Sequence, residues 1–291
     1  MLFSIHYTTE YRYAKPVADN LNALRVRPAT TTTQRCDEFH VRIDPESRLG
    51  RHADYFGTEV IEFGVSTPHS SLTIDVRARV VTTAPGDPPD PAWSSLETAA
   101  YQEAAGEFLL ATIAEPHNGS VVELFELGEL ATPLAAVDTL CTLIPDRFEY
   151  RRGVTYVGST VEDLIRAGGG VCQDFVHLAL ILLRRRGIAA RYVSGYLFAS
   201  PPDGGFDSVE VDTHAWLEVL LPDGGERGEP VWVGVDPTNR TRAGEQYVKI
   251  GHGRRYDDVP PIKGVYRGGA PAELSASVVM TRLDPATSAR A

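Results

Sequence analysis

Apolar and polar residues alternate in short runs along residues 1–83; residues 3–7 are one run and residues 72–80 are the clearest. Alternation with a period of two buries one face of a strand and leaves the other in water, as in an antiparallel sheet. Pro, Asp, Gly and Ser, which favour turns, separate the runs. Residues 1–83 are therefore predicted to form an N-terminal antiparallel β-sandwich.

The segment from Ala84 to Ala92 contains four prolines within nine residues. Neither a helix nor a sheet interior tolerates this density, because proline lacks a backbone N–H and fixes φ. Residues 84–92 are predicted to be an extended linker between two domains. The second domain then covers residues 93–291.

This second domain begins with helical stretches. Ala, Leu and Glu, which favour helix, dominate the first two. The third starts at Thr160 with a capping pattern and stops at Gly168. The fourth is apolar on nearly all sides and ends before Gly187, which predicts a buried central helix. The predicted helices are residues 96–114, 134–143, 160–168 and 171–186.

Strands are predicted after the helices, at residues 191–198, 215–221, 231–235 and 274–283. The turn-forming stretch between the second and third strands predicts an antiparallel hairpin. Residues 240–270, including His252, Arg254 and Arg255, are predicted to be solvated polar loop. The fold class is α+β, with a helical core packed on an antiparallel sheet or barrel after the β-sandwich.

The charge balance restricts the possible partners. The chain has 28 Lys and Arg residues and 39 Asp and Glu residues, so its formal net charge is −11. This acidic balance argues against binding a nucleic-acid backbone. Residues 184–186 form the only basic run and close the central helix, where cations offset the helix dipole. No apolar run approaches the roughly 18 residues that span a bilayer, and no secretory signal is visible. The three widely spaced cysteines suit a reducing compartment, so we expect a cytoplasmic protein.

Cys172 comes after Gly168, Gly169 and Gly170, at the predicted start of the central helix. A helix N-terminus carries about half a positive charge and free N–H donors, which activate a thiol and can hold an oxyanion. Glycines let the backbone turn sharply and approach closely. A buried structural cysteine is the alternative, but it has no particular need for three glycines. We interpret Cys172 as a nucleophile.

A thiol nucleophile needs a base, and the base needs an orienting acceptor. His214 and Asp236 flank the predicted hairpin, and their positions average to 225, inside the turn. In a simple register the two residues face each other, with Cβ atoms about 5 Å apart. The carboxylate then accepts from one imidazole nitrogen and leaves the other for the thiol. A structural strand histidine and a turn aspartate are the competing interpretations.

Neighbouring polar and aromatic residues have less specific assignments. Asp174 fits capping of the first helical turn, and His177 fits a core histidine, because it lies near the opposite side of the helix from Cys172. Gln173 either orients substrate or packs. Trp216 and Trp232 either pack the hairpin or line a groove.

Four motifs resemble the transglutaminase-like superfamily of papain-like thiol enzymes. They are Gly-Val-Cys172-Gln-Asp-Phe, Arg191-Tyr-Val-Ser-Gly-Tyr, Thr-His214-Ala-Trp and Gly-Val-Asp236-Pro-Thr-Asn. Near the start, Tyr-Arg-Tyr-Ala-Lys-Pro-Val and Asp-Tyr-Phe-Gly are similar to the bacterial two-domain branch, whose N-terminal β domain is transglutaminase-like. The resemblance implies Cys172 as nucleophile, His214 as general acid/base and Asp236 as its orienter, acting on amide carbonyls through a thioester.

The same resemblance implies a second oxyanion donor, for which Gln173 and Tyr156 are candidates, and Trp216 is a candidate substrate contact. No cofactor is expected, and no acidic loop has the spacing of a calcium site. The expected partner is a peptide or protein substrate. The N-terminal domain either restricts access to the cleft or recruits a protein partner.

Three functions compete. The first is a cysteine protease, amidase or acyltransferase. The second is a catalytically silent transglutaminase-like module for protein interaction. The third is a metal site formed by Cys172, His214 and Asp236, although structural zinc usually takes Cys or His pairs at short spacing.

Overall fold

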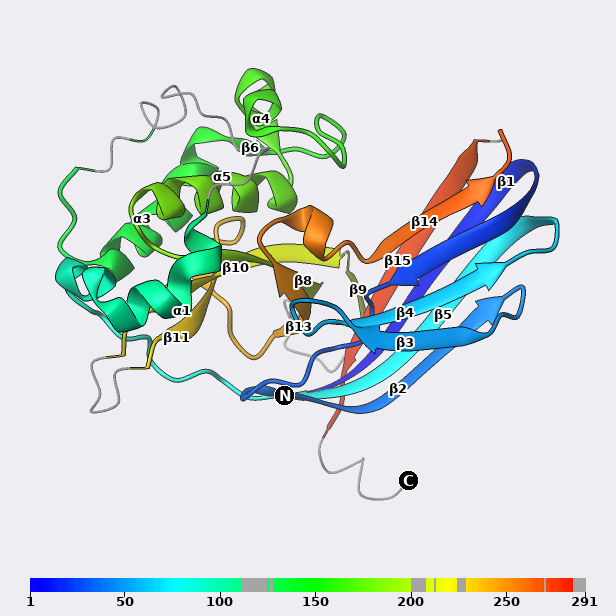
Figure 1. Cartoon of the computed structure of the whole chain (residues 1–291), viewed down its shortest axis with the longest axis horizontal. Coiled ribbons are helices and arrows are strands. Elements are labelled where there is room, and N and C mark those ends of the chain that lie inside the picture. The colour runs from blue at the N-terminus through cyan, green and yellow to red at the C-terminus, as the bar shows by residue number, and fades with distance from the viewer. Residues whose placement is uncertain are drawn as a thin grey trace.

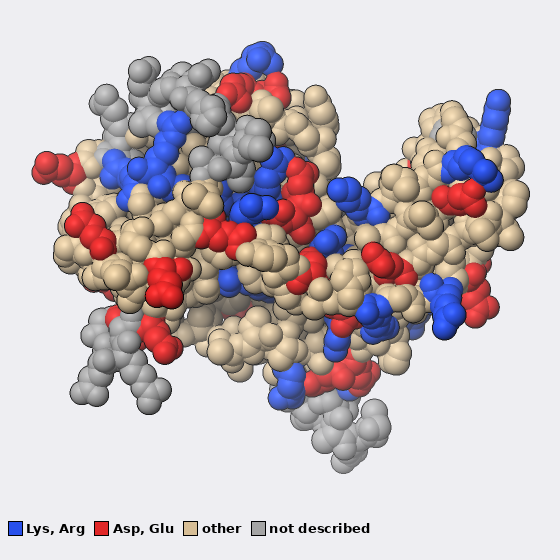
Figure 2. Space-filling view, viewed as in Figure 1, with Lys and Arg blue, Asp and Glu red and all other residues tan. Residues whose placement is uncertain are grey.

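The computed structural model describes residues 1–110, 125, 128–199, 208–211, 213–223, 229–269 and 271–284. These residues form a β-rich lobe and a mixed lobe of helices packed on a sheet (Figure 1). Basic and acidic side chains are interspersed on the face shown in Figure 2, with a notch between the lobes at its upper edge. In the described part of the chain, no helix is long and apolar enough to cross a membrane.

The N-terminal lobe is an eight-stranded antiparallel sheet that curls around one core. Strand β1 belongs to both halves of this sheet. Its first half pairs with β5 and β15, and its second half pairs with β4 and β14. The predicted run 72–80 lies in β5 and alternates as expected. The strands are β1 (Leu2–Leu24), β2 (Gln34–Asp44), β3 (Leu49–Ala53), β4 (Glu59–Val65), β5 (His69–Thr82), β9 (Ser208–Val211), β14 (Ile262–Arg267) and β15 (Ala272–Arg282).

The predicted C-terminal strand exists, but its place in the second domain is wrong. β15 pairs with β1 from Phe3 to Tyr13, so the chain returns to the N-terminal sheet at its end (Figure 1). Val278 and Met280 are buried in the core of that sheet. Alternation specifies which face of a strand is buried and not which strand it pairs with, so the sequence did not show this return.

The second lobe contains a five-stranded antiparallel sheet in the order β12-β11-β10-β8-β13, with α5 packed across one face. Apolar side chains of α5 and of that face form the core of this lobe. The strands are β8 (Ala190–Leu197), β10 (Thr213–Leu221), β11 (Val231–Asp236), β12 (Thr241–Arg242) and β13 (Tyr247–Gly253). The helices are η1 (Trp93–Glu97), α1 (Ala99–Leu109), α3 (Pro133–Arg147), α4 (Val161–Ala167), α5 (Cys172–Arg185) and η2 (Tyr256–Asp258), and β6 (Glu149–Tyr150) pairs with β7 (Gly169–Gly170).

The local sequence signals of α4 and α5 are satisfied. The Thr160 side chain accepts from the Asp163 N–H, and the Asp163 carboxylate accepts from the Thr160 N–H at 2.9 Å. Gly168 then ends α4 in the left-handed region at φ 67°, where a side chain would be strained. α5 is buried on most sides, as its apolar sequence predicted. The predicted helix at 96–114 appears as η1 and α1, and its last residues lie outside the described chain.

The prediction that residues 240–270 are loop is wrong, because they contain β13 and β14. β13 reads Tyr-Val-Lys-Ile-Gly-His-Gly, and its pairing with β8 shifts register between Lys249 and Gly251. A bulge breaks the two-residue period, which is the signal that predicts strands. The charged and glycine residues of this segment therefore suggested a loop.

The two lobes are packed against each other. Tyr196, Phe198, Val248 and Ile250, from the second lobe, are buried in the core of the N-terminal sheet. The Gln34 side chain accepts from the backbone N–H of Lys249 at 2.8 Å and donates to its carbonyl at 2.7 Å. Residues 83–92 form neither helix nor strand, and the limits of independent domains stay a prediction.

Candidate active site

Cys172 is the first residue of α5, and its side chain is partly exposed. In the first turn of a helix the backbone N–H groups have no acceptor within the helix. The N–H groups of Cys172 and Gln173 are therefore donors at the positive end of α5. This end favours negative charge placed beside it.

The three glycines before the cysteine each have a separate structural reason. Gly168 ends α4 with its positive φ. A Cβ on Gly169 would lie 2.6 Å from the carbonyl oxygen of Glu149, and one on Gly170 would lie 2.6 Å from Oδ2 of Asp174. The glycines therefore permit close packing around the start of α5, and only indirectly serve the thiol.

His214 lies between a carboxylate and the thiol. Its Nε2 is 2.7 Å from Oδ2 of Asp236, and the Cys172 side chain is its second hydrogen-bond partner. Because an ionised carboxylate only accepts, Nε2 carries a proton and Nδ1 is left for the thiol. Burial disfavours the imidazolium. The hydrogen bonds to Asp236 and Cys172 and the charges of both outweigh burial, and they raise the pKa of His214 to about 9.

Asp236 is fully buried, and five hydrogen bonds fix its carboxylate. Besides His214, Oδ2 accepts from Nδ2 of Asn239 at 2.7 Å and from the Tyr247 hydroxyl at 2.8 Å. Oδ1 accepts from the backbone N–H groups of Thr238 at 2.8 Å and Asn239 at 3.2 Å. Burial favours the protonated form, but these hydrogen bonds outweigh it and hold the pKa of Asp236 below its ordinary value.

The predicted register of the β10–β11 hairpin is wrong by two positions, although the predicted contact forms. Leu217 pairs with Val235, so continuing the register places Trp216 opposite Asp236. His214 is thus a diagonal neighbour of Asp236. A shift of two residues keeps each side chain on its face of the sheet, whereas a shift of one would not. The imidazole covers the diagonal distance, which is within reach of long side chains.

The remaining predicted site residues, Trp216, Gln173 and Tyr156, differ in how close they lie to Cys172 and His214. Trp216 is buried and stacks on the His214 ring with centroids 6.3 Å apart, so it positions the imidazole. Gln173 adjoins Cys172 in the first turn and is partly exposed. Tyr156 is 76% exposed in the loop before α4, and no contact of its side chain with Cys172 or His214 is observed among the described residues.

Asp174 has the structural role expected of it. Its carboxylate accepts from the Val171 N–H at 2.8 Å and from the Thr155 hydroxyl at 2.7 Å. The first contact closes the N-terminus of α5, and the second attaches the loop before α4 to it. The role of Asp174 is therefore to hold the segment that presents Cys172.

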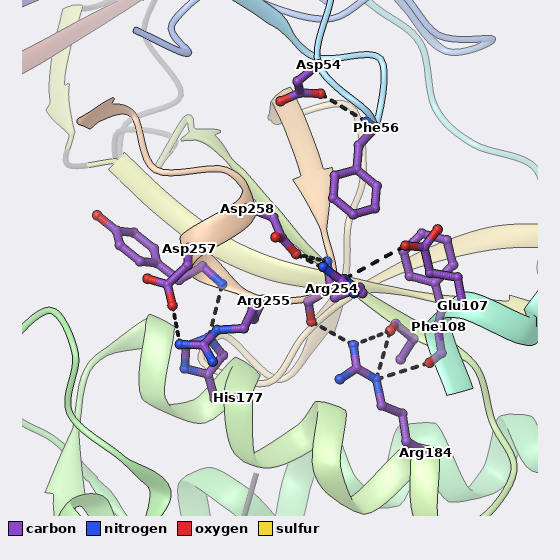
Figure 3. Close-up of polar contacts among 12 residues, drawn as sticks. Asp54, Phe56, Glu107, Phe108, His177, Arg184, Arg254, Arg255, Asp257 and Asp258 are labelled. Carbon is purple, nitrogen blue, oxygen red and sulfur yellow. Dashed lines mark hydrogen bonds and ion pairs between the residues drawn. The ribbon is translucent and has the colours of Figure 1, made fainter. Parts of the chain in front are cut away.

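His177 is also structural, as predicted. It lies on α5 beneath η2, and its Nε2 accepts from the backbone N–H of Tyr256 at 3.2 Å (Figure 3). Burial, followed by the charges of Arg255 and Arg184, lowers the pKa of His177 to about 4, so this ring is neutral near pH 7. A neutral acceptor is what the N–H of Tyr256 requires.

Arg184 lies in the last turn of α5 as expected, but its guanidinium is buried and binds carbonyls of other segments. It donates to the carbonyl oxygens of Phe108 at 3.1 Å, Ala190 at 2.9 Å and Arg254 at 2.7 Å (Figure 3). Arg254 in turn forms ion pairs with Asp258 and Glu107. The prediction that the segment around Arg254 is merely a solvated loop is wrong.

No three His, Cys, Asp or Glu side chains converge as a metal site would require, within the part of the chain that the structure describes. Of the three candidate residues, His214 lies between Asp236 and Cys172. Asp236 contacts Nε2 of the His214 ring, and Cys172 is the second hydrogen-bond partner of that ring.

Asn239 and Tyr247 are the site residues that the sequence analysis missed. Asn239 had a signal, because Asp236-Pro-Thr-Asn239 is a turn sequence whose side chains bond to nearby backbone. Tyr247 had none, because it reaches Asp236 from β13, a strand whose sequence predicts a loop.

Comparison with known proteins gives a consistent result. Residues 3–81 match the family described as "Bacterial transglutaminase-like N-terminal region", and residues 126–237 match the "Transglutaminase-like superfamily". An uncharacterized protein of Mycobacterium leprae is 35% identical over 280 residues, covering 95% of this chain and 97% of the relative. One of Mycobacterium tuberculosis is 33% identical over 275 residues, covering 90% and 87%. The chain belongs to the transglutaminase-like superfamily, as its motifs indicated.

A solved structure has the same fold. It is described as a putative cysteine protease from Cytophaga hutchinsonii, with a TM-score of 0.77 and 23% identity, covering 98% of this chain and 91% of that one. The similarity extends over both lobes, so the combination of the curled N-terminal sheet with the helix-on-sheet core is shared.

Proposed function

We propose that this protein is a thiol enzyme in which Cys172, His214 and Asp236 act together on peptide or glutamine-type amide carbonyls. The observation that carries the proposal is the position of the His214 ring, with Asp236 on Nε2 and Cys172 as its other partner. A strand histidine with a purely structural role would not need a buried carboxylate fixed by five hydrogen bonds. The family and the fold support the same class of chemistry.

In this proposal the thiolate of Cys172 attacks the amide carbon and forms a C–S bond. The N–H groups at the start of α5 stabilise the resulting oxyanion. His214 gives its Nδ1 proton to the leaving amine as the C–N bond breaks, which leaves a thioester. Water or a primary amine, deprotonated by His214, then attacks the thioester and releases Cys172.

Selective alkylation tests the nucleophile. We expect iodoacetamide at pH 6.5 to modify Cys172 before Cys36 and Cys141, because burial raises the pKa of both other thiols, to about 12 for Cys141. Mass mapping would locate the label. Cys172→Ala should abolish the fast phase, and Cys36→Ala is the matched control that should keep it.

The same variants decide the reaction. Glutamine-containing peptides incubated with and without a primary amine would show whether the acyl group passes to water or to the amine. Turnover that vanishes in Cys172→Ala supports the enzyme. A Cys172 that stays unmodified near neutral pH contradicts it and favours the catalytically silent interaction module.

A further inference from the structure

A cavity lies on the face of the second lobe's sheet that is turned away from α5. Ala215, Leu217 and Val219 of β10 point into the core beneath α5, so Trp216 and Glu218 point to the other face. There, a pocket of about 620 Å³ lies between this face, residues 31–34 of the N-terminal lobe and the proline-rich segment 85–89. This volume is typical of a site for a small molecule.

The nearly buried floor of this pocket carries more positive than negative charge, whereas the two other charged lining residues, Asp87 and Arg242, are exposed and of opposite sign. Nε of Arg191 and Nζ of Lys249 both lie 2.6 Å from the same oxygen of Glu218. The three side chains are only 11–14% exposed. Two cations therefore face one carboxylate in a nearly buried position. Buried charge without compensation is costly, so the surplus cation favours an additional anion.

The neighbours of Arg191 do not neutralise it. Its guanidinium lies over the Trp232 ring, 3.9 Å from the ring centroid, and Nη1 lies 3.0 Å from Nε2 of His252. Burial, followed by the charges of Lys249 and Arg191, lowers the pKa of His252 to about 3, so this imidazole is a neutral acceptor. The contacts orient the guanidinium and leave the charge excess in place.

Aromatic side chains form the adjoining wall. Trp216, Trp232 and Tyr247 line the same pocket. Aromatic walls beside a cationic floor suit a molecule that combines an apolar body with one negative end. We propose that this pocket binds a small organic carboxylate, held at its charged end by Arg191 and Lys249.

This site is separate from the proposed active site. The described residues that line the pocket do not include Cys172, His214 or Asp236. Trp216 and Tyr247 contact both regions, since Trp216 stacks on His214 and Tyr247 donates to Asp236. The ligand would thus lie next to residues that support His214 and Asp236, and its binding does not depend on whether Cys172 is reactive.

Titration of the full-length protein tests the proposal. 3-Phenylpropionate is the probe, 3-phenylpropionamide is its uncharged match and inorganic phosphate is an anion without an apolar body. Two of the three tryptophans line the pocket, so tryptophan fluorescence at constant ionic strength reports binding. The carboxylate should bind at least about ten-fold more tightly than the amide or phosphate, as expected for a charge-assisted hydrogen bond.

Lys249→Met should weaken binding of the carboxylate at least about ten-fold and leave a protein at least as stable as the original, because the Arg191–Glu218 pair is then balanced. Lys263→Met, at an exposed lysine of another cavity, is the matched control and should bind normally. Equal binding of amide and carboxylate, equal binding of phosphate, or unchanged binding in Lys249→Met would overturn the proposal. The probe comparison decides the matter even if Lys249→Met does not fold.

Discussion

The carboxylates of Asp236, which is buried, and Glu218, which is nearly so, lie on the same face of one sheet, and their surroundings differ. Asp236 receives five hydrogen bonds, four of them from uncharged groups, and its one titratable partner is His214. Glu218 faces two cations, Arg191 and Lys249. Around Asp236 the charge can change with a single proton, which suits catalysis. Around Glu218 positive charge is in excess near pH 7, which suits binding.

Both clusters depend on β13. The Tyr247 hydroxyl donates a hydrogen bond to Asp236. Lys249, two positions further along the strand, donates from its ammonium group to Glu218. Changes at the two carboxylates should therefore have different consequences even though one strand supports both.

Asp236→Asn should reduce amide turnover by about 10³–10⁴-fold while the protein stays folded, because an amide at this position favours the wrong tautomer of His214. The measurement is peptide turnover alongside a thermal unfolding curve. Glu218→Gln, corrected for the folded fraction, should keep turnover within a few-fold. Equal losses of turnover in both variants would mean that the clusters do not differ in function.

Glu218→Gln should instead lower stability by about 3 kcal/mol, because it leaves two buried cations without their carboxylate. For a protein of this size the midpoint of thermal unfolding should fall by about 6–10 °C. Lys249→Met, which removes the surplus cation, should not lower it. If Glu218→Gln unfolds at the same temperature as the original protein, the charges of Arg191 and Lys249 are solvated.

The pH dependence of stability should have opposite signs at the two clusters. The pKa of His214 is raised from 6.5 to about 9. Protonated His214 therefore contributes its full share to the free energy of unfolding below pH 6.5, and this share is lost as pH rises through 9. The pKa of Lys249 is lowered from 10.5 to about 8, chiefly by burial. The charged Lys249 therefore destabilises the folded protein fully below pH 8, and this destabilisation disappears towards pH 10.5. Each shift corresponds to about 3 kcal/mol.

Urea unfolding between pH 6 and 10.5 measures both contributions. His214→Gln should lack the loss of stability between pH 6.5 and 9, and Lys249→Met should lack the gain above pH 8. If His214→Gln keeps the full loss, another group causes it and the strong coupling of His214 to Asp236 is refuted.

Tyr247→Phe should have the smallest effect, about 3–10-fold on turnover and about 1.5 kcal/mol on stability, because it removes one donor to a buried carboxylate. The hydroxyl lowers the pKa of Asp236, so the acid limb of the pH–rate profile should move to higher pH. Tyr196→Phe is the matched control, since the buried Tyr196 hydroxyl has no hydrogen-bond partner among the described residues. An unmoved acid limb would reduce Tyr247 to a packing residue.

The sequence predicted those parts of the molecule whose signals are local. The Thr160 cap, the Gly168 stop, the buried α5 and the alternation in β5 all appear where expected. The contact of His214 with Asp236 was also predicted despite the wrong register, because an even shift preserves the face. These features depend on residues within one element or one hairpin.

The parts that could not be predicted depend on partners far apart in the chain or on irregular backbone. The return of β15 to β1 joins opposite ends of the chain, and no local pattern encodes it. β13 is bulged, so its period is broken, and with it Tyr247, Lys249 and His252 were assigned to a solvated loop. The whole Glu218 cluster was missed for the same reason.

The Gln34 side chain bonds to both the N–H and the carbonyl of Lys249, and the Ala29 N–H donates to the same carbonyl at 2.9 Å. One amide side chain thereby substitutes for a neighbouring strand at the free border of β13. A fragment that begins at residue 93 would uncover this border, and an uncovered strand edge recruits other chains. The N-terminal lobe thus covers the open edge of the second lobe's sheet, and the severed core should self-associate.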